Sequence, residues 1–240
     1  EMTSSLVGSE MCIRDRVIAD TCNKLHVPCV VSDPDEAVLE KESVFGQTFS
    51  YKGEEFAISL AGVYQKENAV LALNALEELD RLGWTTTMEQ RKDGLLHTSW
   101  KGRFTVINKK PLFIVDGAHN AGAADKMAES IRHYFNGKKL IYIMGVFADK
   151  EYKIVLEKTA HFAEKIYTIE TPDNPRALPA EELAKAARVY NSSAESTKSI
   201  KDAVEKAFSC AGDDENSVIL AFGSLSFIGA LTDAVEEYVG

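Results

Sequence analysis

The amino-acid sequence predicts an α/β protein whose larger part is built on a mostly parallel sheet. The chain has 240 residues, 45% of them apolar, which is enough for one large domain or two small ones with their own cores. After residue 100, apolar strands alternate with helical stretches of ten or more residues, the pattern of βαβ units. The run Leu112 to Val115 is unbroken and apolar, as in a strand covered on both faces. Residues 100–240 are therefore expected to form one Rossmann-like domain.

The first hundred residues predict a smaller set of elements. In chain order these are a helix at 17–27, a buried strand at 28–31, two strands within 43–60 that join at Lys52 and Gly53, a helix at 64–83 and a shorter helix within 87–104. Helix 64–83 carries an apolar arc that we expect to be buried: Ala69, Ala72, Leu73, Leu76 and Leu79. Gly83 is expected to end that helix, and a domain boundary is expected near Ser99.

In the second half of the chain, strands and helices are expected to alternate regularly. The expected strands are 103–108, 111–115, 139–144, 165–169 and 217–222, and the expected helices are 120–136, 150–162, 180–190, 198–210 and 225–238. Helix 120–136 carries an apolar face that we expect to pack on the sheet: Ala124, Met127, Ala128, Ile131 and Phe135.

The amino-acid composition restricts the kinds of molecule that the protein is expected to bind. The chain has 27 Lys plus Arg against 37 Asp plus Glu, a formal net charge of −10, which argues against nucleic acid and anionic membranes and favours small molecules. Cys12, Cys22, Cys29 and Cys210 form no CxxC pair, so we expect reduced, mostly buried thiols and a cytoplasmic location. No apolar run approaches the roughly 20 residues of a membrane span.

The turn "DGAHN" (116–120) is the strongest candidate for a functional site. In open parallel sheets ligands bind at the carboxyl ends of strands, and this turn follows the apolar run directly. Asp116 can accept turn N–H groups or face a ligand, Gly117 permits close backbone approach, and Asn120 can cap the next helix. With His119 beside them, these residues together favour a site. A dinucleotide fingerprint is a poor fit, because Gly117 and Gly122 do not form GxGxxG.

Five motifs in order carry a family resemblance: "WKGRF", "VDGAHN", "GVFADKE", "PDNPRA" and "FGSLSFIG". Together they resemble the carboxyl-terminal domain of the bacterial folylpolyglutamate synthase/dihydrofolate synthase family of the Mur ligase superfamily. The stretch "ISLAGVYQKENAVLALNALEEL" is similar to the last part of that family's central ATPase domain. The resemblance implies that residues 17–98 are the end of an α/β central ATPase domain and 99–240 the Rossmann-like carboxyl-terminal domain. Residues 1–16 match nothing in the family and are expected to be foreign or disordered.

The resemblance implies an ATP-dependent amide ligase, in which a substrate carboxylate is phosphorylated and the amine of glutamate attacks the acyl phosphate. By the family pattern, Asn68, Arg103 and Asp116 match nucleotide-contacting positions, and His119 and Ser224 match positions associated with the incoming glutamate. An arginine can fork onto phosphate oxygens, and a helix start favours a carboxylate. Structural roles are the alternative: a surface amide at Asn68, an exposed charge at Arg103 and a plain N-cap at Ser224.

Three further residues are candidates: Asn120, Lys150 and Arg176. "DNPR" also occurs in Mur ligases that add diaminopimelate, where the arginine reads the amino-acid side chain, so a peptidoglycan ligase is the main alternative. "DGAHN" and "FGSLSFIG" favour the folate branch. Lys150 either holds an anionic ligand or is a solvated lysine at a helix start.

The chain departs from the family in one large respect. It contains no GxxxxGKS or GxxxxGKT, the loop that cradles phosphates. The family's folate pocket and Mg²⁺ ligands are expected upstream of Val17, so no metal site is expected within these residues, and we expect no turnover by this chain alone. The implied partners are ATP, L-glutamate and folate or dihydropteroate, bound by a monomer. A binding module without catalysis and a scaffold that binds nothing are further alternatives.

Overall fold

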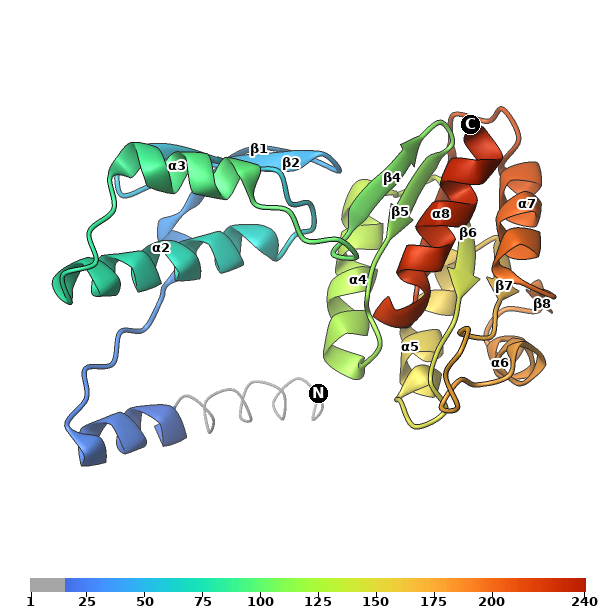
Figure 1. Ribbon diagram of the computed structural model, residues 1–240, viewed down its shortest axis with the longest axis horizontal. Helices are drawn as coiled ribbons and strands as arrows, with labels where there is room; N and C mark the ends of the chain where they lie inside the picture. Colours follow the sequence, from blue (N-terminus) through green and yellow to red (C-terminus); the bar gives the residue numbers. More distant parts are fainter. Residues whose placement is uncertain (1–15) are drawn as a thin grey trace.

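The structure is a computed structural model that describes residues 16–240 (Figure 1). It has two parts, which are joined by the segment 98–104 that runs between helix α3 and strand β4. A helix covers residues 16–25 at the start of the described chain. The prediction for residues 1–16 falls outside the described residues except at its last position.

The first part contains a small antiparallel sheet with strand order β1-β2-β3. Its elements are η1 (Pro34–Glu36), β1 (Val38–Ser43), β2 (Gly46–Tyr51), β3 (Glu54–Ile58), α2 (Gln65–Arg81) and α3 (Met88–His97). The predicted hairpin at Lys52 and Gly53 is confirmed, and both residues have positive φ, +50° and +81°. Helix α2 packs one face on the sheet, and the two share a core of Ala37, Phe49, Tyr51, Phe56, Ile58, Ala69, Val70 and Leu73.

Two predictions for the first part are wrong, and one strand was not predicted. Residues 28–31 form no strand, and Val30 and Val31 are 52% and 84% exposed, because no strand within residues 16–240 pairs with them. Strand β1 was not predicted, since half of its sequence "VLEKES" is charged and most of its residues are exposed.

The expected arc on α2 is displaced by one residue. Ala69 and Leu73 are buried as predicted, but Ala72 and Leu79 are exposed, and Val70 and Asn74 are buried instead. The positions of neighbouring elements, rather than the apolar pattern, therefore decide which side of this helix faces the core.

The second part is a six-stranded sheet with strand order β4-β5-β9-β6-β7-β8. Its strands are β4 (Thr105–Lys109), β5 (Leu112–Val115), β6 (Lys139–Met144), β7 (Lys165–Thr168), β8 (Ala194–Ser196) and β9 (Ser217–Phe222). Only β4 runs antiparallel to its neighbour, so the prediction of a mostly parallel sheet is confirmed. The short edge strand β8 was not predicted.

Helices cover both faces of this sheet (Figure 1). They are α4 (Ala121–Tyr134), α5 (Tyr152–Thr159), α6 (Ala180–Ala187), α7 (Ile200–Ala211) and α8 (Ile228–Val239), with short turns η2 (Ala160–Phe162) and η3 (Leu225–Phe227). Helices α4, α5 and α6 contribute to one core, and α7 and α8 to the other. All five residues of the predicted apolar face of α4 are buried, as expected.

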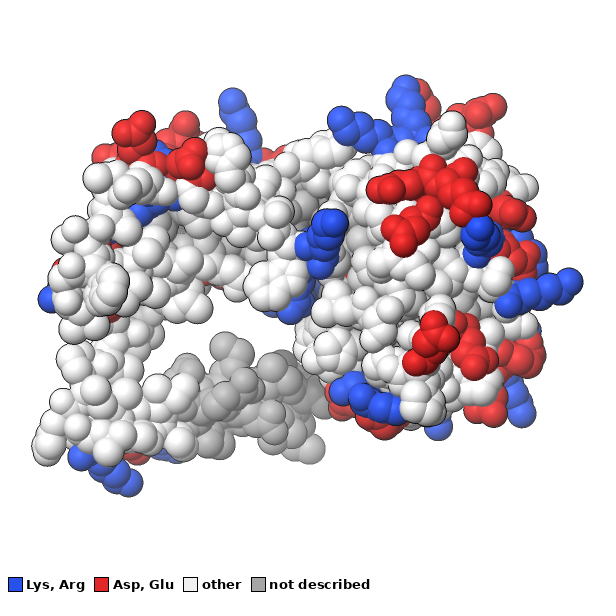
Figure 2. All heavy atoms as spheres, viewed as in Figure 1, with Lys and Arg blue, Asp and Glu red and all other residues white. Residues whose placement is uncertain are grey.

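The thiols are less buried than expected. Cys22 and Cys210 are half-buried and Cys29 is exposed, so the prediction of mostly buried thiols is wrong for these three, and Cys12 lies outside the described residues. Cys29 lies in the unpaired segment after the first helix, where no sheet covers it. Acidic and basic side chains are interspersed on the face of the second part in Figure 2.

A polar contact connects the two parts. The Tyr134 hydroxyl, at the end of α4, donates to Glu42 Oε2 at 3.1 Å and lies 3.3 Å from Gln47 Nε2. Gln47 Nε2 also donates to the carbonyl oxygen of Gly62 at 2.9 Å. The Tyr134 ring packs on Phe104, with ring centroids 5.8 Å apart. These contacts join the β1–β2 hairpin to α4 beside the cavity described next.

Candidate functional site

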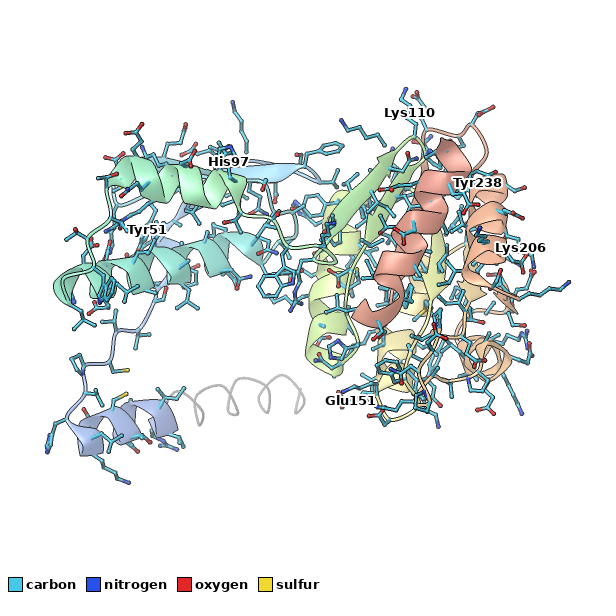
Figure 3. All side chains as sticks on the ribbon, in the orientation of Figure 1. Tyr51, His97, Lys110, Glu151, Lys206 and Tyr238 are labelled. Carbon is cyan, nitrogen blue, oxygen red and sulfur yellow. The ribbon has the colours of Figure 1, made fainter. Side chains whose placement is uncertain are left out.

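The candidate site lies at the carboxyl-end edge of the second sheet, where the turn 116–120 leaves β5. Glu151, just before α5, marks this edge, and Lys110, in the β4–β5 turn, marks the opposite one (Figure 3). The Gly117 N–H donates to the Gly102 carbonyl at 2.7 Å, which ties the turn to the segment that enters from the first part. A Cβ at Gly117 would lie 2.5 Å from Leu225 Cδ2, so a larger residue here fits only if this half-exposed leucine side chain shifts.

Asp116 is buried and already has backbone partners. Its Oδ2 accepts the Phe104 N–H and its Oδ1 accepts the Ala118 N–H, both at 2.8 Å. The residue is 5% exposed, and burial raises the pKa of the carboxyl to about 6, although the two N–H groups and Arg103 act in the opposite direction. The carboxylate thus holds the turn and the entering segment together, and it also lines a cavity.

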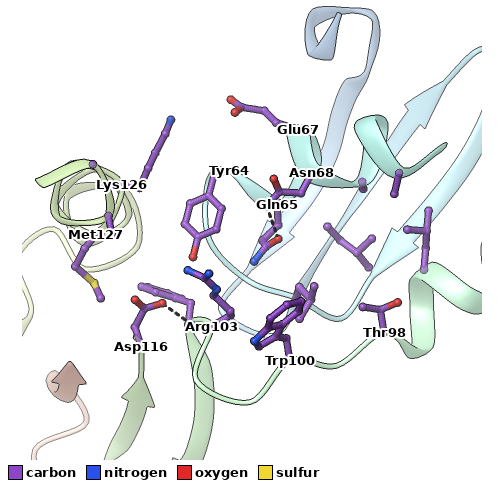
Figure 4. A pocket seen from close by; sticks show the side chains of 18 residues that line it. Tyr64, Gln65, Glu67, Asn68, Thr98, Trp100, Arg103, Asp116, Lys126 and Met127 are labelled. Atoms are coloured by element: carbon purple, nitrogen blue, oxygen red, sulfur yellow. Dashed lines mark hydrogen bonds between the residues drawn. The ribbon is translucent and has the colours of Figure 1, made fainter. Parts of the chain in front are cut away.

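A cavity of about 750 Å³ lies between the two parts (Figure 4). It brings together the three residues that the family pattern associates with nucleotide: Asn68 from α2, Arg103 from the connecting segment and Asp116 from the turn after β5. The Arg103 guanidinium lies over the Trp100 ring, 5.9 Å from its centroid, and has no ion-pair partner within residues 16–240. An exposed cation with an aromatic support is therefore available to an anionic ligand.

The other lining residues are mainly apolar, aromatic and amide, with two charged side chains, Glu67 and Lys126. Asn68 donates to Gln65 Oε1 at 3.0 Å, and the Tyr64 ring lies on the side of Arg103 and Asp116 (Figure 4). Burial raises the pKa of the Tyr64 hydroxyl, and the Asp116 carboxylate acts in the same direction. Tyr64 and Trp100 were not predicted as site residues, although both lie inside the quoted motifs "YQKENA" and "WKGRF".

A second, smaller cavity of about 160 Å³ contains both residues that the family pattern associates with glutamate. It is lined by His119, Lys150 and Ser224, with Phe147 and Ser226 beside them. Ser224 is 5% exposed, and its Oγ accepts the Ser226 N–H at 3.2 Å. The structure therefore brings Lys150 together with His119 and Ser224, and Ser226 is a lining residue that the sequence analysis missed.

Asn120 and Arg176 line neither cavity. The Asn120 side chain accepts the Ala123 N–H at 2.9 Å and so caps α4, which is the structural role weighed for it. The Arg176 guanidinium forks onto Asp149, at 2.5 and 3.2 Å, and lies 4.9 Å from the centroid of the Phe147 ring. This pair lowers the pKa of Asp149. Arg176 thus packs against Phe147, which lines the smaller cavity, without lining that cavity itself.

Residues 16–240 contain no group of three or more His, Cys, Asp or Glu side chains that could hold a metal ion. Over the same range, no helix is both long enough and apolar enough to span a membrane.

The family model described as "Mur ligase, glutamate ligase domain" matches residues 102–225. Since this match covers just over half of the chain, the protein belongs to the Mur ligase family, as the motifs indicated. Among curated proteins, the chain is similar to the dihydrofolate synthase/folylpolyglutamate synthase of Bacillus subtilis (strain 168). The two are 29% identical over 210 residues, which make up 85% of this chain and 46% of that protein.

Two solved structures have the same fold. The folylpolyglutamate synthase of Mycobacterium tuberculosis, complexed with ADP and AMPPCP, superposes with a TM-score of 0.76 at 22% identity over 93% of this chain and 52% of that one. A bifunctional folylpolyglutamate synthase/dihydrofolate synthase with Mn, AMPPNP and L-glutamate bound gives 0.69 at 22% identity over 92% and 51%. The chain thus spans about half the length of these relatives.

Proposed function

We propose that this chain is part of an ATP-dependent ligase that adds L-glutamate to the γ-carboxylate of folate through an acyl phosphate, with dihydropteroate as a second acceptor. The observation that carries the proposal is the turn 116–120, which directs Asp116 into the larger cavity and His119 into the smaller one. One turn then connects a nucleotide site with an amino-acid site. Such a connection suits a reaction in which an amine attacks a carboxylate that ATP has activated.

The larger cavity is proposed to bind ATP. Arg103 offers a charged fork for phosphate oxygens, and the Asn68 amide and the aromatic rings of Tyr64 and Trp100 suit a nucleobase. Asp116 holds the segment that carries Arg103, because it accepts the N–H of the next residue, Phe104. When ATP is bound, it supplies the phosphoryl group that activates the acceptor carboxylate.

We do not assign the binding of a divalent cation to the described residues. The relative solved with AMPPNP also contains Mn, but the described residues offer no cluster of acidic or histidine ligands. The residues present do not fit a metal centre, so no step at Mg²⁺ is assigned to them. We propose further that the protein acts on small molecules in the cytoplasm as a monomer, in keeping with its net charge of −10.

The alternative of a diaminopimelate-adding ligase predicts an arginine that is free to read the amino-acid side chain. Arg176 is instead paired with Asp149 and lies outside the smaller cavity. This arrangement favours glutamate as the amino acid.

Isothermal titration calorimetry of the 240-residue chain with ADP, L-glutamate and meso-diaminopimelate tests the proposal. ADP and L-glutamate should each bind, and Arg103→Ala should weaken ADP about tenfold to a hundredfold, the worth of a charge-assisted hydrogen bond. Arg81→Ala is the matched control, because Arg81 is an exposed arginine of α2 outside the cavity. Stronger binding of diaminopimelate than of glutamate would point to a peptidoglycan ligase, and no binding of ADP or glutamate would point to a scaffold.

A further inference from the structure

Gln47 connects the two walls of the larger cavity, although it does not line that cavity. One wall is formed mainly by α2, and the other by the segment 100–104 and α4. The Gln47 side chain is buried, and its Nε2 donates to the Gly62 carbonyl oxygen at 2.9 Å and to the Tyr134 hydroxyl at 3.3 Å. The same carbonyl oxygen accepts the N–H of Gln65, the first residue of α2, at 3.0 Å, and Tyr134 is the last residue of α4. One amide group therefore joins both walls.

The Tyr134 hydroxyl extends this connection to strand β1. It accepts from Gln47 and donates to Glu42 Oε2 at 3.1 Å. The other carboxylate oxygen, Glu42 Oε1, contacts Nε2 of His133, the neighbouring residue on α4. Because the carboxylate polarises the hydroxyl to which Gln47 donates, the two hydrogen bonds strengthen each other. We call the chain of Gly62, Gln47, Tyr134 and Glu42 the polar relay.

The polar relay reaches Arg103 through a ring contact. The Tyr134 ring packs on Phe104, which is buried, lines the larger cavity and follows Arg103 directly. Val44 and Ala61 of the first part also pack on the core that includes Phe104. Such apolar contacts hold surfaces together without fixing their direction, whereas hydrogen bonds are directional. The polar relay is therefore suited to setting the orientation of one wall relative to the other.

From these contacts we infer that Gln47 is a positioning residue for the ligand of the larger cavity. By holding the start of α2 and the end of α4 together, it fixes the separation of Asn68 from Arg103 on the opposite wall. The inference rests on the proposed function, since it takes ADP or ATP as the ligand that contacts both walls. Such a ligand binds only the arrangement in which both walls are in place, so a loosened relay lowers its apparent affinity.

The first measurement is the dissociation constant of ADP, determined by isothermal titration calorimetry of the 240-residue chain. Gln47→Met keeps the length of the side chain but has no N–H to donate, and it should weaken ADP about fivefold, the worth of one hydrogen bond between neutral groups. Glu42→Gln keeps an acceptor for the Tyr134 hydroxyl and should weaken ADP less than Glu42→Ala does. Glu55→Ala is the matched control, because Glu55 is an exposed residue of β3 outside the cavity, and it should leave the constant unchanged.

The second measurement separates positioning from stability. Gln47 Oε1 is buried and has no hydrogen-bond partner within residues 16–240, so Gln47→Met removes an unpaired acceptor together with the two hydrogen bonds. Its melting temperature should therefore change little while ADP binding weakens. Residual dipolar couplings of the backbone amides report the orientation of the two parts without ADP. One alignment tensor should fit both parts of the unsubstituted chain, and the two parts of Gln47→Met should require different tensors.

Unchanged ADP affinity in Gln47→Met would overturn the inference, and so would a single tensor that still fits both parts of that variant. An equal loss of ADP affinity in Glu55→Ala would overturn it as well, because the effect would not depend on the polar relay. If the unsubstituted chain binds no ADP, the proposed nucleotide site is wrong, whereas the couplings still decide whether Gln47 fixes the two walls.

Discussion

Replacing Asp116 by asparagine should destabilise the fold, because the two carboxylate oxygens have separate backbone donors. Each oxygen accepts an N–H at 2.8 Å, one from Phe104 and one from Ala118. An asparagine side chain has one acceptor oxygen, and its amide nitrogen would face the other N–H as a second donor. A buried N–H that loses its partner costs about 1 to 3 kcal/mol. We therefore expect Asp116→Asn to lower the free energy of unfolding at pH 7 by about that amount.

The same substitution should remove a pH dependence. Burial raises the pKa of Asp116 from 3.8 to about 6 in the folded chain. Because the folded-state pKa is the higher one, the contribution of this carboxyl to stability is complete below about pH 4 and is lost as the pH rises through about 6. The difference between the two pKa values corresponds to about 3 kcal/mol. The stability advantage of the wild-type chain over Asp116→Asn should therefore grow as the pH falls from 7 to 4.

Urea unfolding followed by far-ultraviolet circular dichroism measures this difference between pH 4 and 7. Other titrating groups are common to both proteins, so the difference isolates Asp116. Asp233→Asn is the control, because Asp233 is exposed on α8, and it should change stability by less than about 0.5 kcal/mol. A difference that stays constant across this pH range, or an Asp116→Asn chain as stable as wild type at pH 7, would refute the reasoning.

Three further predictions concern the surroundings of the site. Arg103→Ala should weaken ADP binding tenfold or more but leave the melting temperature nearly unchanged, since the side chain is exposed and unpaired within the described chain; a large loss of stability without a loss of ADP binding would contradict this. Gly117→Ala should lower the free energy of unfolding in urea by about 1 kcal/mol or less, because its Cβ would overlap only the side chain of Leu225, which is 47% exposed and can turn away; a loss well above that would show that Leu225 is held in place. Tyr134→Phe should cost about 1 kcal/mol by thermal denaturation, because it removes the hydroxyl that contacts Glu42 across the two parts; no effect would mean that this contact is not maintained in solution.

Local pattern was sufficient to predict most of the second part. All five expected strands lie within two residues of strands β4, β5, β6, β7 and β9, because continuous apolar runs between turn residues have few other ways to fold. The apolar face of α4 was predictable for the same reason. The edge strand β8 was missed because a strand of three residues, one buried and two half-buried, is too short to carry a periodic signal.

The first part was harder to predict because the burial of its residues depends on contacts between elements that are far apart in the sequence. The run 28–31 is apolar, but a strand forms only where another strand pairs with it. On α2, Asn74 is buried because it accepts the Tyr51 hydroxyl at 2.8 Å, a long-range contact that no local pattern encodes. Strand β1 carries alternating charges and was not predicted.

The candidate site was partly predictable. The motifs identified Asn68, Arg103 and Asp116, and the structure brings them to one cavity. Their roles in binding stay predictions. The sequence could not reveal that both Asp116 oxygens already hold backbone N–H groups, because one donor, Phe104, is twelve residues away. Nor could it place Trp100 beside Arg103, since that contact depends on the path of the connecting segment.

The central claim is that one turn serves two separate binding sites. The most direct test is a ¹H–¹⁵N correlation spectrum of the 240-residue chain, titrated first with ADP and then with L-glutamate. ADP should shift the amide signals of residues 64–68, 100–103 and 116, whereas L-glutamate should shift those of 119, 147–150 and 223–226. Shifts at one shared set of residues, or shifts confined to surfaces outside both cavities, would contradict the account.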